Sequence, residues 1–270
     1  MINKFIIFIQ FLILKFKFYL RKNITHIIYK RHKSNLIYQK HIDEIKNNGY
    51  SLIDNFFSKD DCDEIIKDLD NFISNNQKYL SYNEDQSDVR VFGINNSEIK
   101  FIKKFNEDKI FQDIGENFIE CKIRNFFTMF GKTKFKEQNP GSGGGWHRDS
   151  IQPSYKTMIY LSDVNEKNGA FQIIKNSNNF SNIIRDHYHL NNKKLLNTRF
   201  SNNEINKLIK NFKYIAQTIP GKAGTILLFD GSNLHRGQPL IEGERYALTN
   251  YYYPASKKID PEHFKPMYEK

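Results

Sequence analysis

Two histidines and one aspartate of this chain are spaced as ligands of one metal ion. His147 and Asp149 follow the glycine-rich run Gly141–Gly145, and His235 follows the apolar stretch Thr225–Phe229. In an extended strand, residues i and i+2 point to the same side, so His147 and Asp149 can reach one ion. Two imidazoles and one carboxylate leave metal positions open, as in non-heme Fe(II) oxygenases. The three residues are therefore candidate metal ligands and candidate catalytic residues.

Two alternative interpretations of these histidines remain. The residues of the triad could be ordinary hydrogen-bonded side chains, with no metal between them. The pair His187 and His189 has the only other metal-like spacing, but it lies in a polar stretch that shows no strand pattern. A nearby arginine is a further candidate for the same site.

That arginine is Arg245, which stands ten positions after His235 and opens the alternating stretch Arg245–Tyr253. A guanidinium inside a barrel is costly unless it binds an anion. Its planar fork suits a carboxylate held by two parallel hydrogen bonds. A surface ion pair with Glu242 or Glu244 is the alternative.

Composition narrows the classes of function. The chain has 270 residues and a formal net charge of +11, but its lysines are spread along the sequence rather than grouped with aromatic residues. This pattern does not favour nucleic-acid binding. The two cysteines, Cys62 and Cys121, lie far apart, which excludes a zinc ribbon and makes a disulfide scaffold improbable. A reducing compartment is the simplest inference, and it suits ferrous iron.

Residues 1–34 form a hydrophobic and basic segment that differs from the remainder. The apolar run from Phe5 to Leu14 is shorter than the roughly 20 residues that a spanning helix needs. The segment is a candidate membrane anchor or interfacial helix; a helix packed on the domain and a wrongly assigned start are the alternatives. Basic residues follow the apolar run, so we expect the body of the protein in the cytoplasm, with membrane association through this segment.

Residues 35–270 have the pattern of one globular domain, with helices first and strands after them. Helices are predicted over 36–48, from Ser58 as N-cap through 73, and over 108–120. Strands are predicted over 50–53, 89–94, 123–136, 157–162, 170–174, 225–229 and 245–253. This order predicts an α+β, mainly β fold, in which N-terminal helices flank a sandwich or jelly roll. A polar insert over 176–213, with a helix over 204–212, is either a lid over the site or a solvated excursion.

These segments together resemble the phytanoyl-CoA dioxygenase family of Fe(II)/2-oxoglutarate oxygenases. The resemblance rests on His147-Arg148-Asp149, Leu161–Gln172, Phe229–Gly237 and Arg245, and it covers residues 48 to 254. It implies a double-stranded β-helix core of the cupin type. It also implies that His147, Asp149 and His235 bind iron, and that Arg245 holds the distal carboxylate of 2-oxoglutarate.

The reaction that the resemblance implies is hydroxylation of an unactivated C–H bond in a small-molecule or lipid-like substrate, with 2-oxoglutarate and O2 as co-substrates and release of succinate and CO2. A carboxylate at Asp149 fills the position that related halogenases leave for chloride, which disfavours halogenation. Gln138 and Trp146 are candidate contacts for the near end of 2-oxoglutarate. The stretch Lys175–Asn178 replaces the usual Pro-Gly-Ser-His turn, and Met158 stands where an aromatic residue is expected, so the substrate pocket differs from that of relatives.

Two other functions remain open. A non-oxygenase, cupin-like metal-binding barrel would release no succinate and would not depend on Arg245. A membrane-surface scaffold would depend on residues 1–34 and would tolerate changes in the triad.

Overall fold

Two antiparallel sheets form the centre of the fold. The computed structural model describes residues 2–28, 36–190 and 198–269. The larger sheet has the strand order β1-β8-β5-β10-β4-β3-β2, and the smaller has the order β7-β6-β9. The strands are β1 (Tyr50–Ile53), β2 (Ser81–Tyr82), β3 (Asp88–Phe92), β4 (Ile123–Lys134), β5 (Tyr155–Tyr160), β6 (Phe171–Ile174), β7 (Ala216–Ile219), β8 (Ile226–Asp230), β9 (Leu234–Gly237) and β10 (Glu244–Pro254).

The two sheets pack face to face through a buried apolar cluster. Met158 and Ala247 of the larger sheet pack with Phe171, Ile173 and Ile219 of the smaller one. Side chains alternate along a strand, so the same strands present a second apolar set to the opposite face. Every residue of β5 is buried for this reason. The jelly-roll core predicted from the strand pattern is confirmed.

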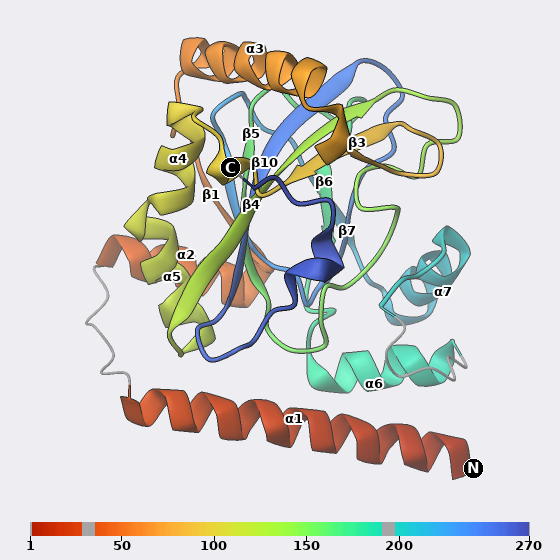
Figure 1. The fold of residues 1–270 in the computed structure, drawn as a ribbon. Helices are drawn as coiled ribbons and strands as arrows, with labels where there is room; N and C mark the ends of the chain where they lie inside the picture. The colour runs from red at the N-terminus through yellow and green to blue at the C-terminus, as the bar shows by residue number, and fades with distance from the viewer. Residues whose placement is uncertain (1, 29–35, 191–197, 270) are drawn as a thin grey trace.

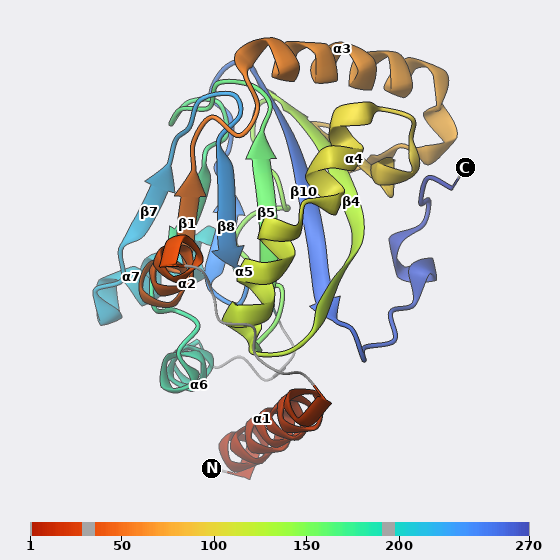
Figure 2. The same ribbon diagram turned by 90° about the vertical axis from the view of Figure 1, so that its left-hand side faces the viewer.

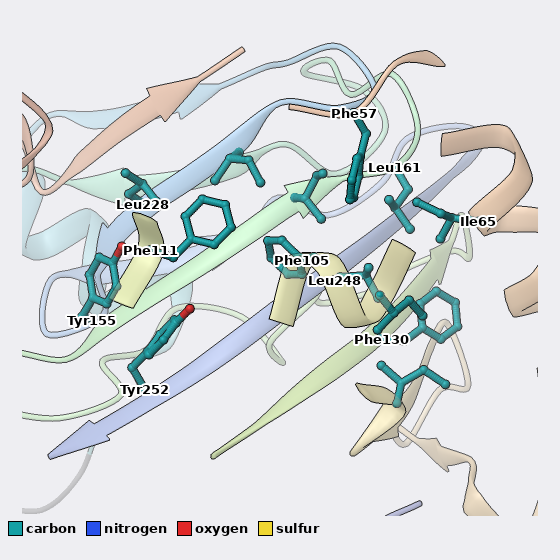
Figure 3. Packing of buried hydrophobic residues seen from close by; sticks show 14 of the residues in the cluster. Phe57, Ile65, Phe105, Phe111, Phe130, Tyr155, Leu161, Leu228, Leu248 and Tyr252 are labelled. Carbon is teal, nitrogen blue, oxygen red and sulfur yellow. The ribbon is translucent and has the colours of Figure 1, made fainter. Parts of the chain in front are cut away.

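Helices cover the outer face of the larger sheet. They are α2 (Leu36–Asn48), α3 (Lys59–Asn75), α4 (Lys100–Glu107) and α5 (Lys109–Ile119), and Figure 2 shows α4 and α5 lying across the strands. Phe105 and Phe111 pack there against Leu228 and Leu248, as the close view in Figure 3 shows. The predicted cap of α3 is present, because the Ser58 hydroxyl accepts a hydrogen bond from the Asp61 amide.

The N-terminal segment folds as the long helix α1 (Ile2–Ile28). It lies alongside α6 (Phe180–His189), on the side of the molecule opposite α3 (Figure 1). Phe11 is buried in this contact, with its ring 5.8 Å from that of Phe180 and 5.5 Å from that of His187. Among the described residues, no helix has the length and hydropathy required to cross a bilayer. The expected cytoplasmic location stays a prediction.

The insert over 176–213 carries two helices, α6 and α7 (Asn202–Phe212), and residues 191–197 lie outside the described part. Ile183, Asp186, Ile205 and Leu208 of the insert are buried. The described part of the insert is therefore packed onto the domain, which contradicts the solvated alternative. Its action as a lid stays a prediction.

Candidate metal centre

His147, Asp149 and His235 come together at one end of the sheets. His147 pairs with His235 in a single β-bridge, in which each backbone amide donates to the other residue's carbonyl at 2.9 Å. Nε2 of His147 lies 3.8 Å from Asp149 Oδ1, and Nε2 of His235 lies 3.7 Å from Asp149 Oδ2. One ligand atom from each residue lies within 4.8 Å of the others. This spacing can hold one metal ion.

Hydrogen bonds orient both imidazoles toward that point. Nδ1 of His147 lies 2.9 Å from the carbonyl oxygen of Gly145, and Nδ1 of His235 lies 2.9 Å from that of Asn233. A carbonyl only accepts hydrogen bonds, so each Nδ1 carries the proton and each Nε2 offers its lone pair. Burial lowers the pKa of both histidines, that of His147 to about 3 with a further contribution from His235. Both rings are therefore neutral at pH 7, as metal ligands must be.

Asp149 is held charged beside the two rings. Burial alone would raise the pKa of its carboxyl group, but Lys156 and the two histidines lower it below the ordinary value. The Nζ of Lys156 lies 2.7 Å from Asp149 Oδ2. Gly231 makes room for this carboxylate, because a Cβ added there would lie 2.1 Å from Oδ2. A charged carboxylate and two neutral imidazoles fit a divalent ion such as Fe(II).

Arg148, between the two ligands, points to the opposite side and is buried. Its Nη2 lies 3.1 Å from Asp186 Oδ2, and its Nη1 donates to the carbonyl oxygens of Ser177 and Ser232. Sequence reasoning missed Asp186. The available signal was that strand alternation turns Arg148 away from the metal, where a buried guanidinium needs an acidic partner.

Arg245 is also buried, with 4% of its surface exposed. Its Nη1 donates to the carbonyl oxygen of Gly169 at 2.5 Å, while its Nε has no hydrogen-bond partner. The alternative of a surface ion pair is wrong, because Glu242 pairs with Lys167 and Glu244 with Lys132. A buried guanidinium with an unsatisfied N–H fits the carboxylate of an absent small molecule.

Space lies next to Arg245 on the inner face of the larger sheet. Ala247 stands two positions after Arg245 and pairs with Gly131 of β4. A Cβ added at Gly131 would meet no heavy atom within 4 Å. A buried guanidinium with an unpaired Nε and open space near it fits a carboxylate bound to Arg245 between the sheets.

A cavity of about 900 Å³ opens beside the metal ligands. His147, Asp149 and Lys156 belong to its lining, as do Thr198 and Arg199 of the insert. The cavity connects the candidate metal centre to the surface.

The structure does not bring Gln138 or Trp146 to the triad. Gln138 is exposed in the loop after β4. Trp146 packs into a separate apolar cluster with Phe200 and Leu208, and the guanidinium of Arg236 lies 4.6 Å from its ring. Contact of either residue with 2-oxoglutarate stays a prediction, which this packing does not support.

The second histidine pair does not form a metal site in the described part of the chain. Nδ1 of His187 lies 2.9 Å from the carbonyl oxygen of Ile183, and Nε2 of His189 lies 2.8 Å from Nδ2 of Asn211. The triad is the only group of three or more potential ligands found among the described residues.

Three solved structures of similar fold and low sequence identity contain a bound metal, and two of them also contain 2-oxoglutarate. The epimerase SnoN from nogalamycin biosynthesis, in complex with Fe3+, alpha ketoglutarate and nogalamycin RO, is 12% identical, with a TM-score of 0.60 over 82% of this chain and 84% of that one. HygX from Streptomyces hygroscopicus, with nickel, 2-oxoglutarate and hygromycin B bound, is 12% identical, with a TM-score of 0.55 over 81% and 88%. EctD from S. alaskensis with bound Fe is 14% identical, with a TM-score of 0.60 over 82% and 78%. At these identities the likeness establishes the fold alone.

Sequence comparison identifies the family. No curated protein sequence matches the chain. The family model described as phytanoyl-CoA dioxygenase (PhyH) matches residues 45–241, which is more than half of the chain and includes all three candidate metal ligands. The chain belongs to the phytanoyl-CoA dioxygenase family.

Proposed function

We propose that this protein is an Fe(II)/2-oxoglutarate-dependent dioxygenase that hydroxylates an unactivated C–H bond of a small-molecule substrate, with release of succinate and CO2. The observation that carries the proposal is the combination of the triad with the buried guanidinium of Arg245, whose Nε has no hydrogen-bond partner. A metal-binding barrel without an oxidative role would not need a buried cation of this kind next to open space.

Each residue has a distinct role in this proposal. His147 and His235 would bind Fe(II) through Nε2, and Asp149 would bind it through a carboxylate oxygen. Arg245 would bind the distal carboxylate of 2-oxoglutarate, and Gly131 leaves room for the molecule between the sheets. The bound iron and 2-oxoglutarate, together with O2, supply the oxidising chemistry. The protein orients the reactants and excludes water by burying the site.

Hydroxylation is favoured over halogenation, because the carboxylate of Asp149 would fill the metal position that related halogenases leave for chloride. The structural neighbours include an epimerase and a carbocyclase, so the family's chemistry is broader than hydroxylation. The substrate panel that tests the reaction therefore includes lipids, sugars and amino acids. Each product is analysed for an added oxygen atom as well as for a change in stereochemistry or ring closure.

The first experiment measures the co-substrate. The protein is loaded with Fe(II) and 2-oxoglutarate without oxygen, O2 is then added, and succinate is quantified with and without the panel. We expect slow succinate release in the absence of substrate and faster release with a substrate. A protein that binds metal but releases no succinate under any condition would favour the cupin-like, non-oxygenase barrel.

The second experiment tests Arg245 directly. The affinity for 2-oxoglutarate is measured with redox-inert Ni2+ in wild type, in Arg245→Met and in the control Arg236→Met, whose guanidinium lies over Trp146. Loss of a buried charge pair costs about 2 kcal/mol or more, so we expect at least about 30-fold weaker binding for Arg245→Met alone. Unchanged affinity in Arg245→Met would remove the basis of the proposal.

A further inference from the structure

The cavity beside the metal ligands is rich in basic side chains. Of the described residues in its lining, six are arginine or lysine and two are aspartate: Arg90, Arg148, Lys156, Arg199, Lys257 and Lys258, with Asp149 and Asp260. A cavity lined by one sign of charge attracts ligands of the opposite sign. A basic side chain of the lining that has no acidic partner within the protein would favour an acidic substrate.

Several of these cations have partners that bind them within the fold. Arg148 pairs with the buried Asp186, and Arg90 pairs with Asp88 of the same strand. Lys156 is different, because its partner Asp149 is a candidate metal ligand. A metal ion would compete with Lys156 for the charge of that carboxylate.

The charges at the loaded site leave Lys156 uncompensated. The charges of Fe(II), Asp149, Arg245 and the 2-oxoglutarate dianion cancel, and the positive charge of Lys156 remains. Lys156 is only 8% exposed, and its Nζ lies 4.1 Å from the centre of the Tyr251 ring. A buried charge without a counter-ion is unfavourable, so an additional anion within reach of Lys156 would be stabilised.

We propose that the substrate carries an acidic group, a carboxylate or a phosphate, that binds to Lys156 next to the metal. The remainder of the substrate would lie on the aromatic side chains of the same cavity, namely Phe92, Tyr251, Tyr253 and Phe264. The substrate class is thus an acid with an apolar or aromatic body. This inference rests on the proposed function, because it requires bound metal and 2-oxoglutarate.

The test uses matched acidic and neutral probes on the full chain loaded with Ni2+ and 2-oxoglutarate. The pairs are octanoate with octanamide, phenylacetate with phenylacetamide, and phenyl phosphate with phenol. Affinities are measured by calorimetry for wild type, Lys156→Met, Lys156→Arg and the control Lys175→Met. Lys175 lies outside the cavity lining, with its Nζ 2.9 Å from Asn48 Oδ1.

For wild type, we expect at least one acid to bind about 10-fold more tightly than its neutral partner. This preference should persist in Lys156→Arg and Lys175→Met and fall below about threefold in Lys156→Met. The carboxylate and phosphate pairs show which acid the site prefers. Equal binding of every pair by wild type, or a preference that survives in Lys156→Met, would overturn the proposal.

Two further outcomes separate this inference from the function on which it depends. If wild type does not bind 2-oxoglutarate, the proposed function fails, and the inference fails with it. If 2-oxoglutarate binds normally but no acid is preferred, only the inference fails. If Lys156→Met no longer binds Ni2+, Lys156 serves to hold Asp149, and its assignment to substrate is wrong.

A separate observation concerns α1, whose outer face is apolar and exposed. Phe11 is 1% exposed and Leu14 is partly buried against α6, whereas eight large apolar side chains of the helix are exposed. These are Phe5, Phe8, Ile9, Leu12, Ile13, Phe16, Tyr19 and Leu20. Their spacing of three and four residues places them along one stripe of the helix. A stripe of this length normally has a partner.

The charge of α1 indicates the kind of partner. The helix sequence contains no acidic residue and five basic ones, Lys4, Lys15, Lys17, Arg21 and Lys22. An amphipathic helix with these properties binds in the interface of an anionic bilayer without crossing it. The geometry points to such a surface as the partner of α1. Phe18 of this helix also lines the cavity, so the cavity would lie close to the bilayer.

Vesicle sedimentation of the full chain tests this second inference. The vesicles consist of phosphatidylcholine alone or of phosphatidylcholine mixed with phosphatidylserine. The variant Phe8→Glu/Phe16→Glu changes the exposed stripe, and the control Ile215→Glu/Ile241→Glu changes two exposed apolar residues elsewhere. We expect wild type and control to bind the anionic vesicles, with partitioning reduced at least about 10-fold in the stripe variant.

The alternatives give different results in the same experiment. Equal binding of wild type and the stripe variant, or no binding by wild type, would overturn the membrane assignment. If wild type is a dimer in solution and the stripe variant is a monomer, a second copy of the chain covers the stripe, and the membrane assignment is also wrong.

Discussion

Asp186 should be essential for stability, although it touches neither metal ligand. Its side chain and that of Arg148 are both fully buried, with Nη2 and Oδ2 3.1 Å apart. Replacement of Asp186 by leucine would leave the guanidinium with carbonyl partners only. Removing one member of a buried pair costs about 3 to 5 kcal/mol, and Tyr214 would also lose its acceptor. Domains of this kind are typically stable by about 5 to 15 kcal/mol, so the loss is large.

Urea unfolding of the metal-free protein measures this cost. The control Asp63→Leu removes an exposed carboxylate whose partner is Lys59, and it should change the free energy of unfolding by less than about 0.5 kcal/mol. The double variant Arg148→Met/Asp186→Leu removes both charges and should recover most of the loss, because burial raises the pKa of Asp186 despite the adjacent arginine. A cost below about 1 kcal/mol for Asp186→Leu, or no recovery in the double variant, would refute this reasoning.

Three further predictions concern the metal centre. Gly231→Ala places a methyl group 2.1 Å from the present position of Asp149 Oδ2, so Ni2+ affinity measured by calorimetry should fall at least about 10-fold. Gly131→Ala meets no heavy atom within 4 Å and should leave the melting temperature unchanged while weakening 2-oxoglutarate binding; unchanged binding would place the co-substrate elsewhere. Burial lowers the pKa of His147 from 6.5 to about 3, so the unfolded state binds more protons in this range. The free energy of unfolding of the metal-free protein should therefore fall as pH decreases from about 6.5 toward 3, by about 2 kcal/mol at pH 5, and replacement of His147 by glutamine should reduce this dependence.

The features that could be predicted from sequence are those with a local signal. The Ser58 cap and the apolar spacing after it predict α3, and the structure has this helix over Lys59–Asn75. The spacing of His147 and Asp149 places both side chains on one side of an extended segment. The segment forms isolated bridges from His147 to Arg199 and His235 rather than the expected strand, yet the alternation that the prediction used is preserved.

The features that could not be predicted depend on contacts between distant segments. The short strands β7 and β9 were not expected, because each acquires its partner, β6, only in the folded sheet. The helix α4 was not expected either; its residues Ile102 and Phe105 are buried in the outer apolar cluster. Lys156 lies just outside the strand predicted over 157–162, and only the fold places its ammonium 2.7 Å from Asp149. Trp146 was a candidate contact for 2-oxoglutarate, but alternation turns it to the side opposite His147, where it packs toward α7.

The alternation of side chains along residues 147–149 brings two metal ligands together and also links them, through Arg148, to the helices α6 and α1 on the outside of the molecule. Arg148 must point away from the metal because its two neighbours point toward it, and Asp186 of α6 is the acid that compensates its charge. The helix α6 in turn packs against Phe11 of α1. If α1 binds a bilayer as proposed above, that surface would lie next to the helix that carries the acidic partner of Arg148. A chain of contacts thus links the N-terminal helix, through α6, to Arg148, which stands between two of the candidate metal ligands.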